Sequence, residues 1–65
     1  MVVKYILKLE SLKGEITQKE VRFEQGFDEL RVAQDSGRYT IGSLFERHAY
    51  SDGGLDVFPI AAFTS

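Results

Sequence analysis

Hydrophobic and polar residues alternate along the first part of the chain. From Val2 to Glu10, one parity is apolar or aromatic throughout, comprising Val3, Tyr5, Leu7 and Leu9. A period of two is typical of a strand with one buried face. Ser11 to Gly14 follows as a short polar segment ending in glycine, which favours a tight reversal. We therefore predict a strand over Val2–Glu10 and a hairpin after it.

The return strand of this hairpin is predicted over Glu15–Glu24. Its alternation is less regular, because Ile16 has one parity whereas Val21 and Phe23 have the other. A bulge between them, or a frayed start, would bring these apolar side chains onto one face of the sheet.

A helix is predicted over Phe27–Ser36. The dipeptide Gln25-Gly26 breaks the preceding strand, and apolar residues then recur at three-residue spacing as Phe27, Leu30 and Ala33. Gly37 stands where a left-handed residue would end the helix. No Ser, Thr, Asp or Asn directly precedes Phe27, so this helix has a weak N-terminal cap.

The last part of the chain predicts a second hairpin. Aromatic and β-branched residues fill Arg38–Tyr50, which indicates a strand, and Ser51–Gly54 contains Asp-Gly, the strongest turn signal of the sequence. The fourth strand, Leu55–Phe63, is apolar on both faces. Pro59 inside it has no N–H to donate, so we expect this strand to lie at a sheet edge or to carry a bulge.

These elements predict one α+β domain over residues 1–65, in the order strand, strand, helix, strand, strand. The helix packs on one face of a four-stranded antiparallel sheet whose spatial order is 2-1-3-4. A chain of 65 residues has room for a single core. With no Cys and one His, neither disulfides nor a structural metal would reinforce that core, which leaves good packing or self-association.

One short helix covers only one face of such a sheet. We expect an exposed apolar patch on the opposite face, formed by Val2, Ile6, Phe58, Ile60 and Ala62 and flanked by Lys4, Lys8 and Glu10. The alternative is that the register slips at Pro59, because a slip of one residue exchanges the two faces of a strand. The candidate partner-binding residues are Ile6, Phe58, Ile60, Phe63, Lys4 and Lys8.

No group of residues predicts a catalytic, metal or cofactor site. His48 is the only histidine, and Glu46 shares its parity, so this pair is the one arrangement suited to acid–base chemistry. Zinc takes several His or Cys ligands, and a calcium loop needs more oxygen donors than Asp52 and Asp56 provide. Gly53-Gly54 lacks the Lys and Ser or Thr of a phosphate-binding loop. We expect no enzyme, no cofactor and no metal.

Charge and hydropathy narrow the range of partners. The net charge is −2, from ten acidic and eight basic residues, which disfavours nucleic acid. The N-terminus has no signal-peptide pattern, and no stretch approaches the roughly 18 apolar residues of a membrane span. We therefore expect a cytoplasmic protein with no membrane contact.

The leading hypothesis is a small protein-interaction module that docks a sheet face, or the edge of its last strand, onto a protein partner or a second copy of itself. In size and element order the chain resembles some small phage-encoded anti-defence proteins, including certain anti-CRISPR proteins. This resemblance rests on architecture and implies an inhibitor; an adaptor is the other interpretation. The alternative is a nucleic-acid-associated protein with phosphate contacts from Lys4, Lys8, Arg38 and Arg47. Base stacking on Tyr39, Phe45 and Tyr50 would accompany it, although core packing is the favoured role of these rings.

Overall fold

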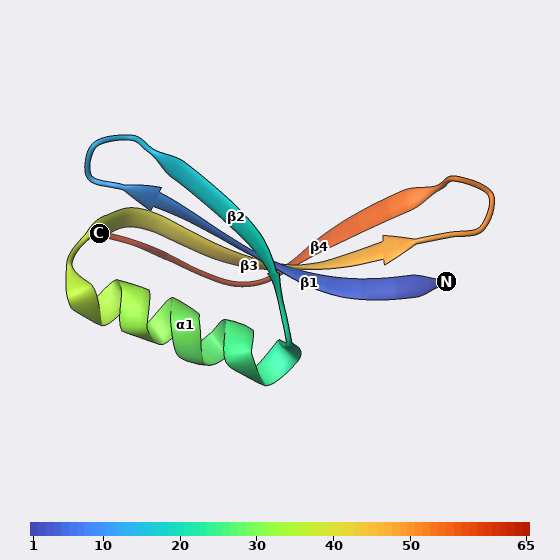
Figure 1. The fold of residues 1–65 in the computed structure, drawn as a ribbon, viewed down its shortest axis with the longest axis horizontal. Coiled ribbons are helices and arrows are strands. Elements are labelled where there is room, and N and C mark those ends of the chain that lie inside the picture. Colours follow the sequence, from blue (N-terminus) through green and yellow to red (C-terminus); the bar gives the residue numbers. More distant parts are fainter.

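The computed structural model describes all residues from Met1 to Ser65. The elements are β1 (Val2–Ser11), β2 (Ile16–Val21), α1 (Phe23–Ser36), β3 (Tyr39–Ala49) and β4 (Leu55–Thr64). The strands form one antiparallel sheet in the order β2-β1-β3-β4, and α1 packs on one face of it (Figure 1). The predicted α+β class and strand order are therefore confirmed.

The core lies between α1 and the two central strands. Leu7 of β1 stands opposite Leu44 of β3, and both are almost fully buried. In the next row of residues that face the helix, Gly42 of β3 stands opposite Phe63 of β4, and the Phe63 side chain belongs to the same core. The buried apolar residues are Leu7, Val21, Leu30, Ala33, Leu44 and Phe63. This core is small because α1 is the only element that covers the sheet.

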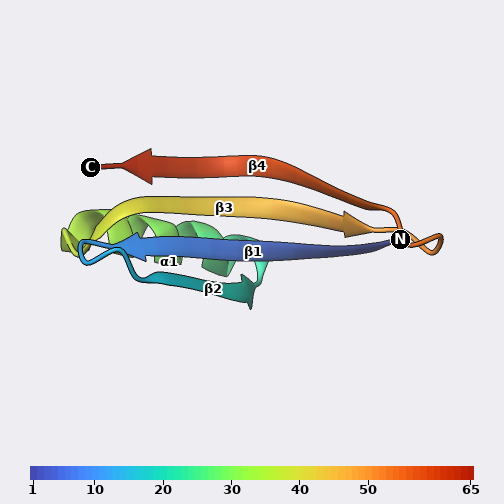
Figure 2. The ribbon, with the colours of Figure 1, turned by 90° about the horizontal axis from the view of Figure 1, so that it is seen from above.

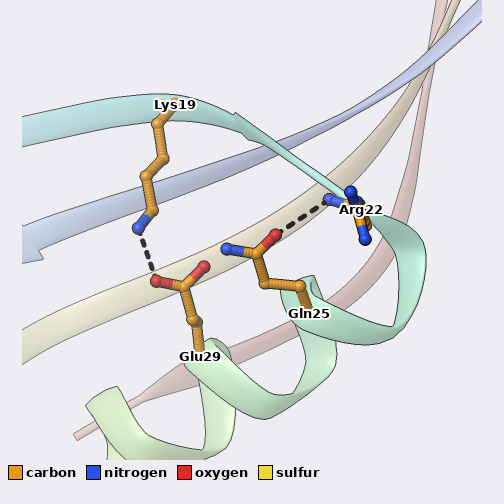
Figure 3. Close-up of polar contacts among 4 residues, drawn as sticks. All are labelled: Lys19, Arg22, Gln25 and Glu29. Atoms are coloured by element: carbon orange, nitrogen blue, oxygen red, sulfur yellow. Dashed lines mark hydrogen bonds and ion pairs between the residues drawn. The ribbon is translucent and has the colours of Figure 1, made fainter.

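The helix begins at Phe23, four residues before the predicted start, and β2 ends at Val21 rather than at Glu24. Gln25 accepts a hydrogen bond from the Arg22 N–H through Oε1 at 3.4 Å (Figure 3), which is one half of a capping box. Gly26 therefore does not break a strand. A Cβ atom there would lie 2.7 Å from Leu44 Cδ1, so the glycine lets the first turn of α1 approach β3 closely.

The β1–β2 hairpin is regular from its turn to the start of the helix. Glu10 pairs with Ile16 and Tyr5 with Val21 without an intervening shift, so the predicted bulge is absent. Ile16 points away from α1 and is exposed, whereas Val21 is buried under it. The irregular alternation of apolar residues in β2 thus arises because Ile16 lies on one face of the sheet and Val21 on the other.

Gly37 and Gly53, like Gly14 in the first turn, take the left-handed conformation that their positions require. Gly37 ends α1 with φ 69° and ψ 11°, as predicted. Gly53 has φ 89° in the turn between β3 and β4, where the Gly54 N–H donates to Asp52 Oδ1 at 2.8 Å. The predicted helix end at Gly37 and the predicted hairpin turn at Asp52-Gly53 are therefore confirmed.

Strand β4 is an edge strand and also carries a bulge, as Pro59 predicted. Its register with β3 shifts between Leu44 and Phe45, which leaves Ile60 unpaired between Pro59 and Ala61. Beyond the bulge the faces of β4 are exchanged. Phe58, which pairs with Glu46, therefore lies on the helix side of the sheet.

The sheet is longer than the helix that covers it. Figure 2 shows α1 alongside one half of the strands, while the start of β1 and the β3–β4 hairpin continue beyond it. We call this uncovered part the arm; it comprises residues 2–4 of β1 and residues 47–58. The molecule measures 40 × 23 × 15 Å. A single layer of sheet in the arm leaves side chains of both faces in solvent.

Candidate interaction surfaces

The structure separates the six predicted partner-binding residues. Lys4, Ile6 and Lys8 lie on the open face, which is the face opposite α1, as expected. The placement of Phe58 and Ile60 on this face was wrong, since Phe58 lies on the helix side and Ile60 packs against the core from the bulge. The register slip at Pro59, considered as the alternative, is the cause. Phe63 was expected on the other face of β4 and is only 7% exposed within the core, so it is not accessible to a partner.

A chain of aromatic rings joins the first turns of α1 to β1. The Phe23 ring lies 5.2 Å from that of Tyr5 and 5.1 Å from that of Phe27, with the two phenylalanines edge to face. Residues four apart lie on the same face of a helix, so Phe23 and Phe27 continue the apolar stripe that includes Leu30. They extend it beyond the core, to the end of α1 next to the arm.

Phe58 brings a further exposed ring to the same side of the sheet. It shares a row with Tyr5, and Glu46 stands between them on β3. Its ring meets the His48 imidazole edge on at 5.2 Å. Phe58 is 48% exposed, Phe23 47% and Phe27 38%. We call this set the aromatic surface: Tyr5, Phe23, Phe27, His48 and Phe58.

Carboxylates are interspersed with these rings. Glu46 and Asp56 occupy the strand rows of the aromatic surface, Asp56 being the cross-strand neighbour of His48. Glu24 follows Phe23 in the first turn of α1, and Arg22 lines the same hollow there. His48 Nε2 lies 2.9 Å from Glu46 Oε1, but the direction is not that of a hydrogen bond. In the strand rows of this surface, the only group able to carry positive charge is therefore His48.

Tyr50 and Asp56 interact at the far end of the arm. A hydrogen bond to the Asp56 carboxylate raises the pKa of Tyr50 above its ordinary value of 10.0, and partial desolvation and the carboxylate charge act in the same direction. The neutral phenol donates this bond and the phenolate cannot. The interaction therefore stabilises the fold below pH 10 and is lost as the pH rises through the pKa of Tyr50 in the folded protein.

We expect Asp56→Asn to lower the pKa of Tyr50 towards its ordinary value of 10.0. The measurement is an absorbance titration of phenolate formation, compared with wild type. Asp52→Asn, in the same hairpin turn, is the matched control and is expected to leave the Tyr50 titration unchanged. Superimposable curves for wild type and Asp56→Asn would contradict the assignment.

Glu46 and His48 are close in space, as the sequence suggested, but they lie on an open strand surface. Neither Glu46 nor His48 lines any of the hollows along α1 or on the open face. No three His, Cys, Asp or Glu side chains gather in a way that could hold a metal ion. Within the aromatic surface, the His48 ring contacts that of Phe58, and Glu46 is the cross-strand neighbour of Phe58.

A groove of about 450 Å³ runs between α1 and β2. Leu9, Ala33 and Tyr39 are among its apolar lining residues, and Lys19 and Glu29 form an ion pair between its two sides (Figure 3). Arg38 also lines this groove. It is thus separated from Lys4, Lys8 and Arg47, which share the open face.

No family model, curated protein or solved structure matches the chain. No helix in the structure is both long and apolar enough to cross a membrane.

The sequence had not indicated Tyr5, Phe23 or Phe27 as surface residues. Phe23 was missed because it was assigned to a strand. The i, i+4 spacing of Phe23 and Phe27 was the available signal.

Proposed function

We propose that this protein is a non-catalytic interaction module that binds another protein through the aromatic surface. The observation that supports this most directly is the exposure of three phenylalanine rings on one side of the sheet, where Phe23 contacts Phe27 and Tyr5, and Phe58 contacts His48. Exposed aromatic clusters of this kind are uncommon outside binding sites, and aromatic side chains contribute much of the free energy at protein interfaces.

The partner has a definable chemistry. Rings from Phe23, Phe27 and Phe58 offer apolar area, and the carboxylates of Glu46 and Asp56 lie among the strand residues of the same surface. A partner segment that combines apolar side chains with Arg or Lys would satisfy both features, since cations bind carboxylates and also the faces of aromatic rings. The proposed ligand is therefore a basic and apolar segment of a protein.

The biological role that follows is that of an inhibitor or adaptor. A module with a binding surface and no catalytic group acts by occupying its partner or by bringing two partners together. The resemblance in element order to small phage-encoded anti-defence proteins supports the inhibitor, and this role rests on architecture.

Selection of short random peptides displayed on phage against the immobilised protein tests the proposal. We expect the selected peptides to be enriched in Arg or Lys together with aromatic or aliphatic residues. Phe58→Ser and Phe23→Ser are expected to weaken the best peptide by at least about tenfold. Val32→Ser is the matched control, because Val32 is 68% exposed on α1 outside the aromatic surface. Peptides that bind all three variants equally would rule out the aromatic surface as the site.

A nucleic-acid partner is the second candidate, and one arrangement favours it. Lys4, Lys8 and Arg47 share the open face with Phe45. Lys4 is already paired with Glu20, however, at 3.6 Å, and Glu10 lies on the same face. An electrophoretic shift assay with single-stranded DNA and RNA at two salt concentrations tests for this partner. A shift that weakens steeply as salt rises would support phosphate binding, and no shift at low salt would rule it out.

A further inference from the structure

The open face of the sheet is apolar along one side. Strands β3 and β4 place a nearly continuous set of apolar residues there, interrupted only by Ser43, Arg47 and Thr64. Val57 and Leu55 are more than half exposed, and Ile41 is 42% exposed. The apolar residues on this side of the open face are Ile41, Phe45, Ala49, Leu55, Val57, Pro59 and Ala62.

The molecule also exposes more surface than a compact monomer of its size. Its accessible area is 4696 Å², whereas a folded monomer of 7.4 kDa is expected to expose about 4,200 Å². Its radius of gyration is 12.5 Å, whereas a compact domain of 65 residues is expected to have about 11 Å. Both differences arise from a sheet that lacks a layer on its open face and over the arm.

We propose that a second copy of this chain supplies the missing layer, so that two sheets pack through their open faces in a dimer with two-fold symmetry. Three strands of ten or eleven residues and one of six, about 4.8 Å apart, present roughly 600 Å² in projection. The accessible area exceeds this projection because side chains protrude from it. A standard interface buries about 800 Å² per partner, so the open face is large enough for a stable dimer.

A two-fold axis across the strands at the level of Phe45 matches the apolar residues of β4. It places the Phe45 and Pro59 side chains of the two copies together at the centre. Positions at equal distances on either side then meet, so that Ala62 faces Val57 and Thr64 faces Leu55. The apolar side of one sheet therefore covers the apolar side of the other, in the manner of a β-sandwich.

The charges on the open face favour a second copy over a nucleic acid. Three basic residues, Lys4, Lys8 and Arg47, are nearly balanced by Glu10 and Glu20, and the side chains of Lys4 and Glu20 form an ion pair. Binding to phosphates requires a clear excess of positive charge, which this face lacks, although the axis at Phe45 places Lys4 opposite Lys8 and Glu20 opposite its own copy.

Sedimentation equilibrium from low to high micromolar concentration tests the dimer with the full chain. We expect wild type to approach twice 7.4 kDa as concentration rises. Val57→Glu is expected to raise the dimer dissociation constant at least about tenfold, because it would bury a carboxylate at the interface. In the monomer this carboxylate faces Arg47 across the strands, so the variant should fold, which far-UV circular dichroism checks.

Val32→Glu is the matched control, since Val32 is an exposed valine on α1, on the other side of the sheet, and its variant should dimerise as wild type does. Ala62→Glu provides a second interface variant on β4 and should weaken the dimer as Val57→Glu does. Wild type that remains monomeric throughout the range overturns the proposal, whether or not it binds single-stranded nucleic acid. Equal effects of Val57→Glu and Val32→Glu also overturn it.

Discussion

Leu44→Ala is expected to lower the free energy of unfolding by about 2–5 kcal/mol. Leu44 is fully buried and contacts both the strand and helix layers of the core. Because the core has only six buried apolar residues, little else is available to fill the cavity. A domain of this size has about 3–10 kcal/mol of stability in total, so the variant loses a large part of it.

Urea denaturation followed by circular dichroism measures this loss. Leu12→Ala is the matched control, because it removes the same atoms from a leucine that is 65% exposed in the first turn. Its effect is expected to stay within about 0.5 kcal/mol. Similar urea midpoints for the two variants would show that the core is not organised around Leu44. If Leu44→Ala does not fold, the milder Leu44→Val must still unfold at lower urea than Leu12→Ala.

Gly42→Ala is expected to destabilise the protein by about 1–3 kcal/mol through overpacking. A Cβ atom at position 42 would lie 2.1 Å from Cε2 of Phe63, whose ring covers this glycine from the neighbouring strand. The backbone at Gly42 does not have positive φ, so the cost comes from the ring and not from the main chain. A smaller side chain at position 63 should therefore relieve it.

A double-mutant cycle measures this relief. Phe63→Leu alone removes buried area and should destabilise the protein, but Gly42→Ala should cost less in the Phe63→Leu background than in wild type. We expect a coupling free energy of about 0.5–3 kcal/mol from urea denaturation of the four proteins. Additive effects would mean that the ring does not restrict position 42.

The fold was predictable where local and tertiary signals agree. Alternation in the first strand, Asp-Gly in the last turn and Pro59 in the edge strand each identified a structural feature correctly. The start of α1 was missed because Gly26 has low helix propensity. Its lack of a side chain is needed for contact with Leu44, which is a tertiary requirement that composition along the chain does not reveal.

The candidate surfaces were predictable only in part. Ile6, Lys4 and Lys8 were placed correctly, since β1 is regular throughout its pairing with β2. Phe58 and Ile60 were not, because the position of the bulge next to Pro59 decides which of the two faces Phe58 takes, and Pro59 alone does not indicate that position. The aromatic surface depends on this bulge and on the early start of α1 together, so neither pattern alone could indicate it.

The interrupted outer edge of β4 has a consequence for how copies of the chain can associate. Pro59 removes one N–H from that edge, and the unpaired Ile60 breaks the regular spacing of its remaining donors and acceptors. An incoming strand would find no continuous template there, and the opposite edge, β2, is short and carries Lys19 and Glu20. Strand-by-strand growth into fibrils is therefore disfavoured, which is compatible with the small, closed dimer proposed above.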